Sequence, residues 1–599
     1  MRSLLGLAAL LAVVGCSSEE AASGPVKTPA APDTARDAPA TTTGTTSAAL
    51  ETTACRYLVP KSAEGTKVVC YDLSVKESRR PGASDKTIKL HVARIKGAAK
   101  TGVPTIELIG GPGGGGDSLV GGIVAGVKDL TDAYAPLLAK GDLIVFDQRG
   151  VGRSLPRLGC PMPSDPKAEP STKDCRDALQ AKGIDLAAYD TVENADDVHD
   201  LKVALGVDKI DLHGISYGTR LALEIVKRHA GDVHATIIDG VMPPDVPILG
   251  AFEAAADKIF SRVFTACAAD AACNAAYPDL EGTLVAAQKR LDATPVQVTH
   301  PLYGPMTYDW PTFRGELLEG LYVEGAAAAI PARLRDALTL DGAAWTKRLE
   351  DEEAAYAAKA AAMQGDADPV KAELRARIES MTEEDFEASG MAGGMYLSVT
   401  CNDYVQHESV DAARAVLSGV RPVLADVSAA EQEADACSSW PTRPSDARTR
   451  EPARFAGKAL VIGGLLDPAT PSTWAEHVAE TLGDRTLVLV PDGAHGFMDE
   501  CGSGLKGAFF ADPSAALDTS CATKRTLAFP KAGAPAPGSS QIAARSSSRV
   551  PTALVAQRPA RTLLERLEHR SLAELAARSH GSAVTLARAE LARARRTAR

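Results

Sequence analysis

The chain of 599 residues lacks several features that mark particular classes of protein. Beyond its N-terminus, no apolar run approaches the roughly 20 residues of a membrane-spanning helix. Basic residues are not in excess, and the net charge of −12 argues against a nucleic-acid partner. Neither Cys-x-x-Cys nor His-Glu-x-x-His occurs, which weakens zinc and thiol-redox chemistry. What is left is a globular protein for which we predict no metal and no organic cofactor.

The N-terminus has the pattern of a targeting segment. Arg2 precedes a short apolar run over 4–14, which ends in Val-Val-Gly-Cys at Cys16. Small residues before a cysteine are typical of bacterial lipoprotein signals, so we predict that 1–16 is a signal and that Cys16 carries lipid. We then expect a protein of the bacterial cell envelope, bound to the membrane through that lipid alone. A plain secretory signal, which would release the protein, is the alternative. Residues 17–50 are rich in Ala, Thr, Pro and Ser and are predicted to be a disordered tether.

The cysteine count agrees with export. Of 11 cysteines, ten remain when Cys16 is set aside, and an even set is typical of proteins that form disulfides outside the cytosol. Sequence alone leaves the connectivity open. Proximity along the chain suggests the pairs Cys55–Cys70, Cys160–Cys175, Cys267–Cys273, Cys401–Cys437 and Cys501–Cys521.

Short apolar runs rich in Val, Ile and Leu alternate with helix-like segments. The helix-like segments include 194–206 and 219–231, and the latter ends in Lys, Arg and His before a glycine. Several apolar runs are continuous, as in strands that are covered on both faces. The pattern predicts an α/β fold with a mostly parallel, eight-stranded sheet. The eight predicted strands lie within 68–75, 88–97, 105–111, 142–148, 209–216, 235–241, 459–464 and 486–492.

The alternation divides the chain into parts, and its length alone suggests two to four domains. Strands and helices alternate over 51–245, the first part of the core, and again over 446–530, its second part with a C-terminal disulfide segment. Between them, 246–445 is Ala-rich and predicted to be a helical cap over the site. The basic segment 531–599 is predicted to be a disordered or partly helical tail, with a patch at the membrane surface as the alternative.

Gly214-Ile215-Ser216-Tyr217-Gly218 places a serine between two glycines, after a predicted strand and before a predicted helix. This context is that of a nucleophile elbow, a sharp turn that exposes the serine hydroxyl above the edge of the sheet. Glycines are required because a Cβ atom would clash in the crowded turn. We predict that Ser216 is a catalytic nucleophile.

A serine hydroxyl is a weak nucleophile and needs an adjacent base. His495 lies in a turn after the last predicted strand, and Asp467 lies in the turn after the strand before it. Both follow the carboxyl ends of strands, where the sites of open α/β sheets form. Asp492 is a rival acid, but it is too close to His495 to come from a separate strand. His213, inside a predicted strand, is interpreted as a packed core residue.

The glycine-rich run 107–116 follows the third predicted strand. It predicts an oxyanion hole in which the amides of Gly111 and Tyr217 donate to the developing charge. A phosphate-binding loop is a rival interpretation, but no Gly-Lys-Ser/Thr follows it. A flexible turn without chemistry is the simplest alternative.

These motifs carry a resemblance to a known family. Residues 110–116 (GGPGGGG), 147–154 (DQRGVGRS) and 214–220 (GISYGTR) resemble the proline iminopeptidase and tripeptidyl aminopeptidase branch of the α/β-hydrolases, peptidase family S33. Three further stretches, 397–404, 465–471 and 492–497, and the closing Cys501–Cys521 segment are similar to the tripeptidyl aminopeptidase group. The family often has His before the first of these glycines. Ile109 stands there instead, which favours the exported, tripeptidyl-type relatives.

The resemblance implies an α/β-hydrolase fold with a helical cap and a serine exopeptidase that acts on the N-termini of peptides. It implies Ser216, Asp467 and His495 as the triad. Asp147 and Arg149, in the shared 147–154 motif, are interpreted as braces of the loop beneath the site. Two other functions stay open: an esterase or amidase with the same triad, and a non-catalytic binding lipoprotein.

An aminopeptidase must also recognise the free α-ammonium group of its substrate, and a buried cation requires a carboxylate partner. Asp403 occupies the position at which the relatives carry Glu or Asp in a similar Cys-Asn-acid motif. We therefore predict Asp403 as the ammonium site. A surface or helix-capping aspartate is the alternative.

Overall fold

The structure is a computed structural model that describes residues 50–99, 102–161, 171–301, 304–364, 368–443 and 447–530. The chain divides into Met1–Thr46 and Ser47–Arg599, and all described residues belong to the second unit. The predicted signal with Cys16, residues 17–49 of the predicted tether and the basic tail from residue 531 lie outside the described residues. Leu50, predicted to end the tether, instead begins a strand, because it pairs with Leu73. Within the part described, no helix combines the length and the apolar character needed to cross a membrane.

One mixed sheet of nine strands forms the centre of the unit, in the order β1-β2-β3-β5-β4-β6-β7-β10-β11. The pairings from β1 to β5 are antiparallel, and those from β5 through β4 to β11 are parallel. Every residue of β4, β5 and β6 is buried, as the continuous apolar runs predict. The strands are β1 (Leu50–Thr53), β2 (Val68–Lys76), β3 (Thr87–Ile95), β4 (Thr105–Leu108), β5 (Leu143–Phe146), β6 (Ile210–Ile215), β7 (Val233–Asp239), β10 (Phe455–Gly464) and β11 (Leu482–Val490).

The prediction of eight strands misses β1. This edge strand has the sequence Leu-Glu-Thr-Thr, and its residues are half-buried or exposed. It therefore has neither the continuous apolar run nor the alternation by which the other strands are recognised. Its pairing with β2 is antiparallel and local.

Helices cover both faces of the sheet. In β5, Ile144 and Phe146 pack in one apolar cluster with α4, α5 and α17, while Leu143 and Val145 pack in another with α1, α2 and α18. The helices of the core are α1 (Asp117–Ala125), α2 (Lys128–Lys140), α3 (Thr172–Ala181), α4 (Thr191–Leu205), α5 (Tyr217–His229), α17 (Ser472–Thr481), α18 (Glu500–Ala511) and α19 (Ser520–Thr523).

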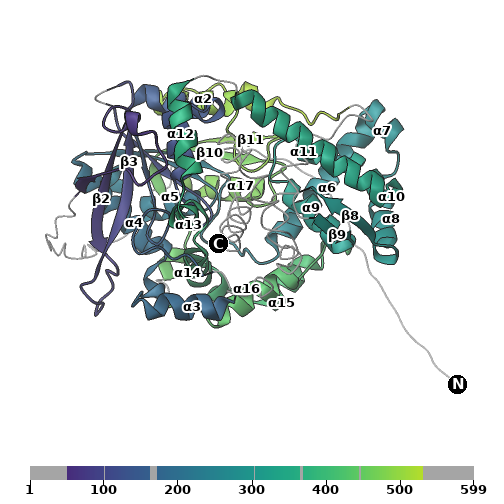
Figure 1. The fold of residues 1–599 in the computed structure, drawn as a ribbon, viewed down its shortest axis with the longest axis horizontal. Helices are drawn as coiled ribbons and strands as arrows, with labels where there is room; N and C mark the ends of the chain where they lie inside the picture. The colour runs from purple at the N-terminus through teal and green to yellow at the C-terminus, as the bar shows by residue number, and fades with distance from the viewer. Residues whose placement is uncertain are drawn as a thin grey trace, which may run out of the picture. The chain divides into compact units, whose positions relative to one another are not determined.

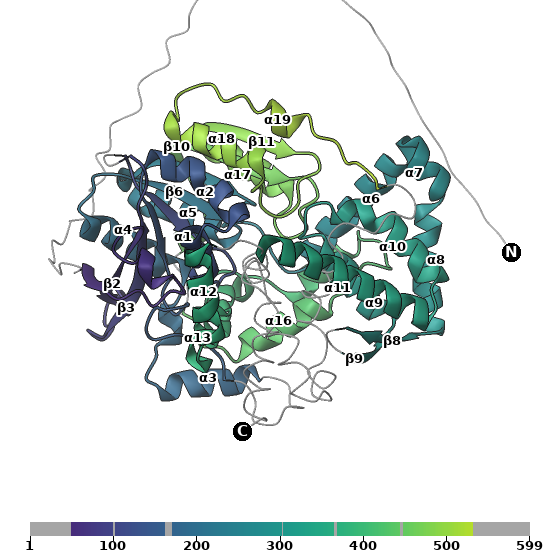
Figure 2. The same cartoon turned by 45° about the horizontal axis from the view of Figure 1, so that its top comes forward.

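A large insertion separates β7 from β10. Its first part, α6 to α11, stands as a separate group beside the sheet in Figures 1 and 2, whereas α12 and α13 lie close to α1. The helices are α6 (Ala251–Ala269), α7 (Ala271–Ala276), α8 (Leu280–Ala293), α9 (Trp310–Gly320), α10 (Ile330–Thr339), α11 (Gly342–Gln364), α12 (Pro369–Glu379), α13 (Glu383–Ser389), α14 (Gly393–Asp403), α15 (Val410–Leu417) and α16 (Ser428–Ser438). The insertion also contains an antiparallel pair that the sequence reasoning missed, β8 (Val296–His300) and β9 (Gly304–Tyr308).

The group around α6 has an apolar core of its own, which includes Phe260, Trp310, Phe313 and Trp345. Leu466, in the turn after β10, packs into the same cluster, so the insertion is joined to the sheet beside Asp467. Single turns of 3₁₀ helix complete the unit: η1 (Lys61–Ala63), η2 (Leu186–Ala188), η3 (Ala230–Asp232), η4 (Ala326–Ala329), η5 (Val405–His407) and η6 (Ala447–Arg450).

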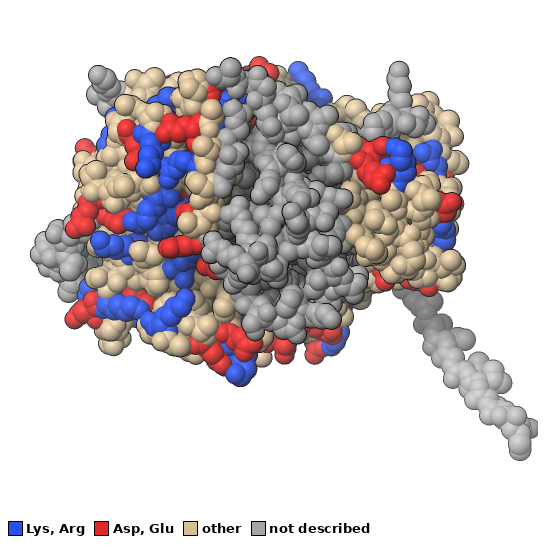
Figure 3. Space-filling view, in the orientation of Figure 1, with Lys and Arg blue, Asp and Glu red and all other residues tan. Residues whose placement is uncertain are grey.

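Five disulfides cross-link the described residues. The pairs are those suggested by proximity along the chain: Cys55–Cys70, Cys160–Cys175, Cys267–Cys273, Cys401–Cys437 and Cys501–Cys521. Such bonds stabilise a fold chiefly by restricting the unfolded chain. On the face shown in Figure 3, Lys and Arg are interspersed with Asp and Glu.

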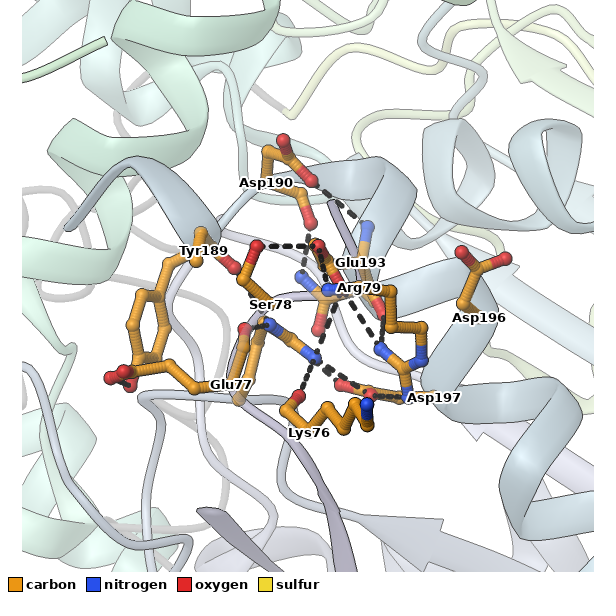
Figure 4. A network of polar contacts seen from close by, with 12 residues as sticks. Lys76, Glu77, Ser78, Arg79, Tyr189, Asp190, Glu193, Asp196 and Asp197 are labelled. Atoms are coloured by element: carbon orange, nitrogen blue, oxygen red, sulfur yellow. Dashed lines mark hydrogen bonds and ion pairs between the residues drawn. The ribbon is translucent and has the colours of Figure 1, made fainter. Parts of the chain in front are cut away.

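Arg79, Glu193 and Asp197 belong to a network of polar contacts (Figure 4), and Arg149 joins this network through Asp197. Arg149 Nε donates to Asp197 Oδ2 over 2.8 Å, and its Nη1 donates to the carbonyl of Ala188 over 2.7 Å. Arg79 reaches the same Asp197 at 2.6 Å and Glu193 at 2.9 Å. A buried guanidinium is tolerated only when it is paired in this way. These contacts give Arg149 the bracing role that the sequence suggests.

His91 in β3 is fully buried and is held as a neutral imidazole. The amide of Arg56 donates to its Nε2 over 3.1 Å, so the ring proton belongs on Nδ1, which lies 3.1 Å from Asp72 Oδ1. Burial lowers the pKa of His91 below its ordinary value, and this effect outweighs the hydrogen bond to Asp72. A second proton on the ring would bind Nε2 and would remove the acceptor of the Arg56 amide.

This burial predicts a loss of stability on acidification. The folded pKa lies below the unfolded value of about 6.5, so the unfolded chain binds the proton more readily. The free energy of unfolding should therefore fall as the pH drops from 7 to 5. His91→Gln, which keeps an acceptor for the Arg56 amide, should show a smaller fall over the same range in urea denaturation. If the free energy of unfolding fell equally in the wild type and in His91→Gln, this pH dependence would not come from His91.

Candidate active site

Ser216 occupies a strained turn between β6 and α5. Its φ of 59° makes it the one non-glycine residue with a positive φ in the part of the chain that the structure describes. A Cβ on Gly214 would lie 2.5 Å from the carbonyl oxygen of Gly218, and one on Gly218 would lie 1.8 Å from that of Leu108. Only glycine fits at both positions. The turn therefore holds Ser216 at the carboxyl end of the sheet, as the motif predicts.

Asp467 and His495 come together from the turns after β10 and β11. His495 Nδ1 lies 2.9 Å from Asp467 Oδ2. The amides of Ala469 and Thr470 donate to Asp467 Oδ1 over 2.8 and 2.9 Å, and the Thr470 hydroxyl donates to Oδ2 over 2.5 Å. The carboxylate is fully buried and oriented by these donors. With Nδ1 bound to Asp467, Nε2 of His495 is the nitrogen left for proton transfer.

The turn of His495 meets the elbow of Ser216 at the ends of β6 and β7. The Ser216 amide donates to the carbonyl of Asp239 over 3.1 Å. A Cβ on Gly240, the residue after Asp239, would lie 3.4 Å from His495 Cε1. Among the contacts of the described residues there is no direct hydrogen bond between Ser216 and His495. In hydrolases without substrate this bond is often long and tightens on binding.

Asp492, the rival acid, and His213, the predicted core histidine, have partners other than Ser216 and His495. Asp492 lies 2.7 Å from Arg525 Nε, in an ion pair. His213 is buried, with its Nδ1 2.6 Å from Glu107 Oε2 and its ring near Tyr134. The core role expected of His213 fits this environment. Asp467 is therefore the acid that contacts His495.

The glycine-rich loop lies directly against Ser216. A Cβ on Gly110 would lie 2.8 Å from the Cβ of Ser216 and 3.4 Å from its Oγ. Gly111, with a φ of 125°, is exposed, and Tyr217 begins α5. Gly111 directly follows Gly110, and Tyr217 directly follows Ser216, so both residues lie next to this close approach. Donation from their amides to an oxyanion remains a prediction.

Asp147 ties the glycine-rich loop to the 147–154 loop. The amides of Gly116 and Arg153 donate to its two carboxylate oxygens over 2.7 and 2.6 Å. Burial raises the pKa of Asp147 to about 7, and the nearby Asp117 contributes, although the two amides oppose this shift. The side chain braces the backbone beneath the site, as the sequence suggests.

Asp403 ends α14 and is 1% exposed. Its Oδ2 accepts a hydrogen bond of 3.1 Å from the amide of Thr191, the first residue of α4, and another from the Thr191 hydroxyl. Burial raises its pKa, while Arg220 and the bonds from Thr191 oppose that shift. This enclosed position gives no support to an ammonium site. The alternative of a helix-capping aspartate fits the contacts, although the residue is buried and not on the surface.

Two aromatic residues of the insertion, which the sequence reasoning missed, reach the site. Tyr322, just after α9, packs edge-on against His495 with ring centroids 5.3 Å apart and planes at 79°. Phe252 of α6 stacks on Tyr322 at 5.7 Å. No local motif marks either residue, because their place depends on how the insertion folds back. The insertion therefore contributes to the surroundings of His495.

A second missed feature is a buried ion pair beneath the site. Lys506 Nζ of α18 lies 2.8 Å from Asp239 Oδ2, and both side chains are about 1% exposed. The amide of Phe497, two residues after His495, donates to the same oxygen over 2.8 Å. Burial opposes ionisation of Asp239, but Lys506 and the Phe497 amide hold its pKa below the ordinary value. Asp239 thus binds the turn of His495 through its side chain and Ser216 through its carbonyl.

Removing this cation should be costly. Lys506→Met is expected to destabilise the fold by about 3–5 kcal/mol, because it leaves Asp239 buried without a counter-charge. Urea denaturation measures the loss. Lys458→Met is the matched control, since Lys458 pairs with Asp484 on the surface and should cost less than about 1 kcal/mol. If Lys506→Met and Lys458→Met lowered the free energy of unfolding by similar amounts, the buried ion pair would contribute no more than the surface pair.

Comparisons with known proteins agree with this arrangement. A family model described as "alpha/beta hydrolase fold" matches residues 112–330, and one described as "TAP-like protein" matches residues 421–521. Serine protease Hip1 of Mycobacterium tuberculosis H37Rv is 31% identical over 228 residues, which are 34% of this chain and 41% of Hip1. A tripeptidyl aminopeptidase of Streptomyces lividans is 30% identical over 177 residues, 26% of this chain and 33% of that protein. The chain thus matches less than half the length of these relatives.

Among solved structures, the proline iminopeptidase of Mycobacterium smegmatis aligns with 71% of this chain and 92% of its own. The TM-score is 0.32 and the sequence identity 16%. The first family model spans Ser216 and the second spans both Asp467 and His495.

Proposed function

We propose that this chain, which has the α/β-hydrolase fold and a TAP-like segment, is a serine hydrolase that releases residues from the N-termini of peptides. The observation that carries the proposal is the Asp467–His495 pair beside a serine in the strained turn of a nucleophile elbow. The distant relatives named serine protease and tripeptidyl aminopeptidase support a peptide substrate.

The proposed reaction proceeds through an acyl-enzyme. Ser216 Oγ attacks the scissile carbonyl while His495 Nε2 takes its proton, and Asp467 stabilises the imidazolium. The amides of Gly111 and Tyr217 donate to the oxyanion. His495 then protonates the leaving amine, which breaks the peptide bond. A water molecule, deprotonated by His495, attacks the ester carbonyl, and the returned proton restores the Ser216 hydroxyl.

The insertion supports a limit on substrate size. Tyr322 contacts the ring of His495, and Leu466, next to Asp467, packs into the apolar core of the insertion. A site covered from this side favours short or terminal segments of peptide over the middle of a folded chain. Because Asp403 is enclosed, the proposal assigns it no contact with substrate.

A panel of reporter amides tests the proposal. Mono-, di- and tripeptidyl amides with a free N-terminus should be cleaved, and acetylation of that N-terminus should abolish or strongly reduce cleavage. A simple acyl ester serves as the comparison. Cleavage of the ester alone would favour an esterase, and the absence of both turnover and labelling by an active-site serine probe would favour a binding protein.

We further propose that the protein acts outside the cytosol, attached through lipid on Cys16. The five disulfides support an oxidising compartment. Thiol titration of the unreduced protein should find essentially no free thiol among the ten paired cysteines. Cys16→Ala should move the protein from the membrane fraction to the soluble fraction. Several free thiols, or an unchanged membrane fraction, would refute the corresponding part of the proposal.

A further inference from the structure

A cluster of histidine and aspartate side chains lies at the far end of α5 from the nucleophile. His199 comes from α4, His229 is the last residue of α5, and Asp232 belongs to η3. One possible ligand atom from each lies within 4.8 Å of the others. The imidazole rings stack with centroids 4.5 Å apart and planes at 13°. Since an α-helix rises 1.5 Å per residue, the cluster lies about 20 Å from Ser216 and is separate from the candidate active site.

Hydrogen bonds already orient the two rings. His229 Nε2 lies 2.7 Å from Asp196 Oδ1, which leaves Nδ1 with its lone pair available. A carboxylate bound to the outer nitrogen of a histidine is the usual second contact of metal-binding histidines. His199 Nδ1 lies 2.5 Å from Asp232 Oδ2, so these two ligand groups already face each other.

The electrostatic surroundings contain both favourable and opposing charges. The carboxyl end of α5 carries the negative end of the helix dipole, which favours a cation. Asp196, the partner of His229, also pairs with Arg228, whose Nη2 lies 2.9 Å from Asp196 Oδ2. Lys202 Nζ, 3.2 Å from Asp232 Oδ1, competes for the same carboxylate.

We propose that His199, His229 and Asp232 bind one divalent transition-metal ion, with zinc as the best match, and that water completes the coordination. Two imidazoles with one carboxylate suit zinc and its neighbours, whereas calcium and magnesium prefer oxygen ligands alone. Tetrahedral ligands about 2.0–2.1 Å from zinc lie roughly 3.4 Å apart. To bind the ion, one imidazole must therefore turn out of the stack, and Asp232 Oδ2 must move away from His199 Nδ1. Bound metal would join α4 to the end of α5 and would stabilise the fold without entering the catalytic reaction.

Zinc titration of the full chain, stripped with chelator and dialysed, tests the site. Calorimetry should show one saturable site per molecule, and His199→Ala and His229→Ala should each weaken binding at least tenfold. His477→Ala is the matched control, because His477 also pairs with an aspartate, Asp245, and its side chain is 37% exposed against 39% for His199. The control should bind zinc as the wild type does. Lys202→Gln should tighten binding, since it removes the competing cation.

Two further measurements do not depend on activity. Zinc should raise the melting temperature of the wild type and of His477→Ala but not of the two ligand variants, and magnesium should raise none. Cobalt should give the visible absorption of a four-coordinate site in the wild type and lose it in His229→Ala. A wild type without a saturable zinc site, or ligand variants that bind zinc and shift their melting temperature like the wild type, would overturn the proposal.

Discussion

Ser216→Ala is expected to reduce turnover of a peptidyl reporter amide by about 10⁴- to 10⁶-fold while the fold is retained. The reaction as proposed has no other nucleophile, because the strained turn presents this one hydroxyl at the end of the sheet. The substitution removes only the hydroxyl group and adds no new atom that could clash, so the fold should be kept. Steady-state kinetics measure the effect, and labelling by an active-site serine probe should disappear.

Ser418→Ala is a suitable control for this substitution, because Ser418 is exposed at the end of α15 and far along the chain from the elbow. It should leave both turnover and labelling unchanged. A Ser216→Ala protein with near-normal turnover would remove the proposed mechanism. A normal melting temperature in the same variant would show that the loss of turnover is not a loss of fold.

Asp467→Asn is expected to reduce kcat by about 10³- to 10⁴-fold, as it does when a triad acid is changed to its amide. The remaining oxygen still accepts from the Ala469 and Thr470 amides, so the turn keeps its shape. The new amide group, however, faces His495 Nδ1 as a donor. It forces the proton of the imidazole onto Nε2, and no base is then left for Ser216. Kinetics with the same reporter amide measure the change.

Two companion variants decide which groups matter for His495. Thr470→Val removes one hydroxyl donor from Asp467 and keeps the carboxylate, so a loss of about tenfold is expected, within the range of one hydrogen bond. Asp492→Asn should have little effect, since Asp492 pairs with Arg525. A larger loss for Asp492→Asn than for Asp467→Asn would reverse the assignment of the acid.

Local patterns were enough to find the residues at the strand ends. Ser216 is marked by glycines at fixed spacing, and Asp467 and His495 follow the last two apolar strands at the carboxyl edge of the sheet. A parallel sheet brings such positions together regardless of the length of chain between them. The fold class follows from the same continuous apolar runs.

Features that depend on distant packing could not be found in this way. Asp403 lies in a motif that suggests a binding residue, but its environment is set by the packing of α14 against the start of α4. Tyr322 reaches His495 only because the insertion folds back toward the turns at the ends of β10 and β11. Neither arrangement produces a recognisable pattern in the residues that are close in sequence. The short strand β1 escaped for a different reason, since an edge strand of polar residues has no apolar signal.

The interruption of the sheet between β7 and β10 also sets the order in which the site is built during synthesis. A nascent chain that has emerged through α5 and β7 already holds Ser216, but the strands that bear its base and acid follow only after the whole insertion. Phe497 and Lys506, the partners of Asp239, are likewise synthesised only after the insertion. Under the proposed mechanism the growing polypeptide is therefore catalytically silent until its last two strands dock, and the cell that makes it is not exposed to a partly folded, active hydrolase.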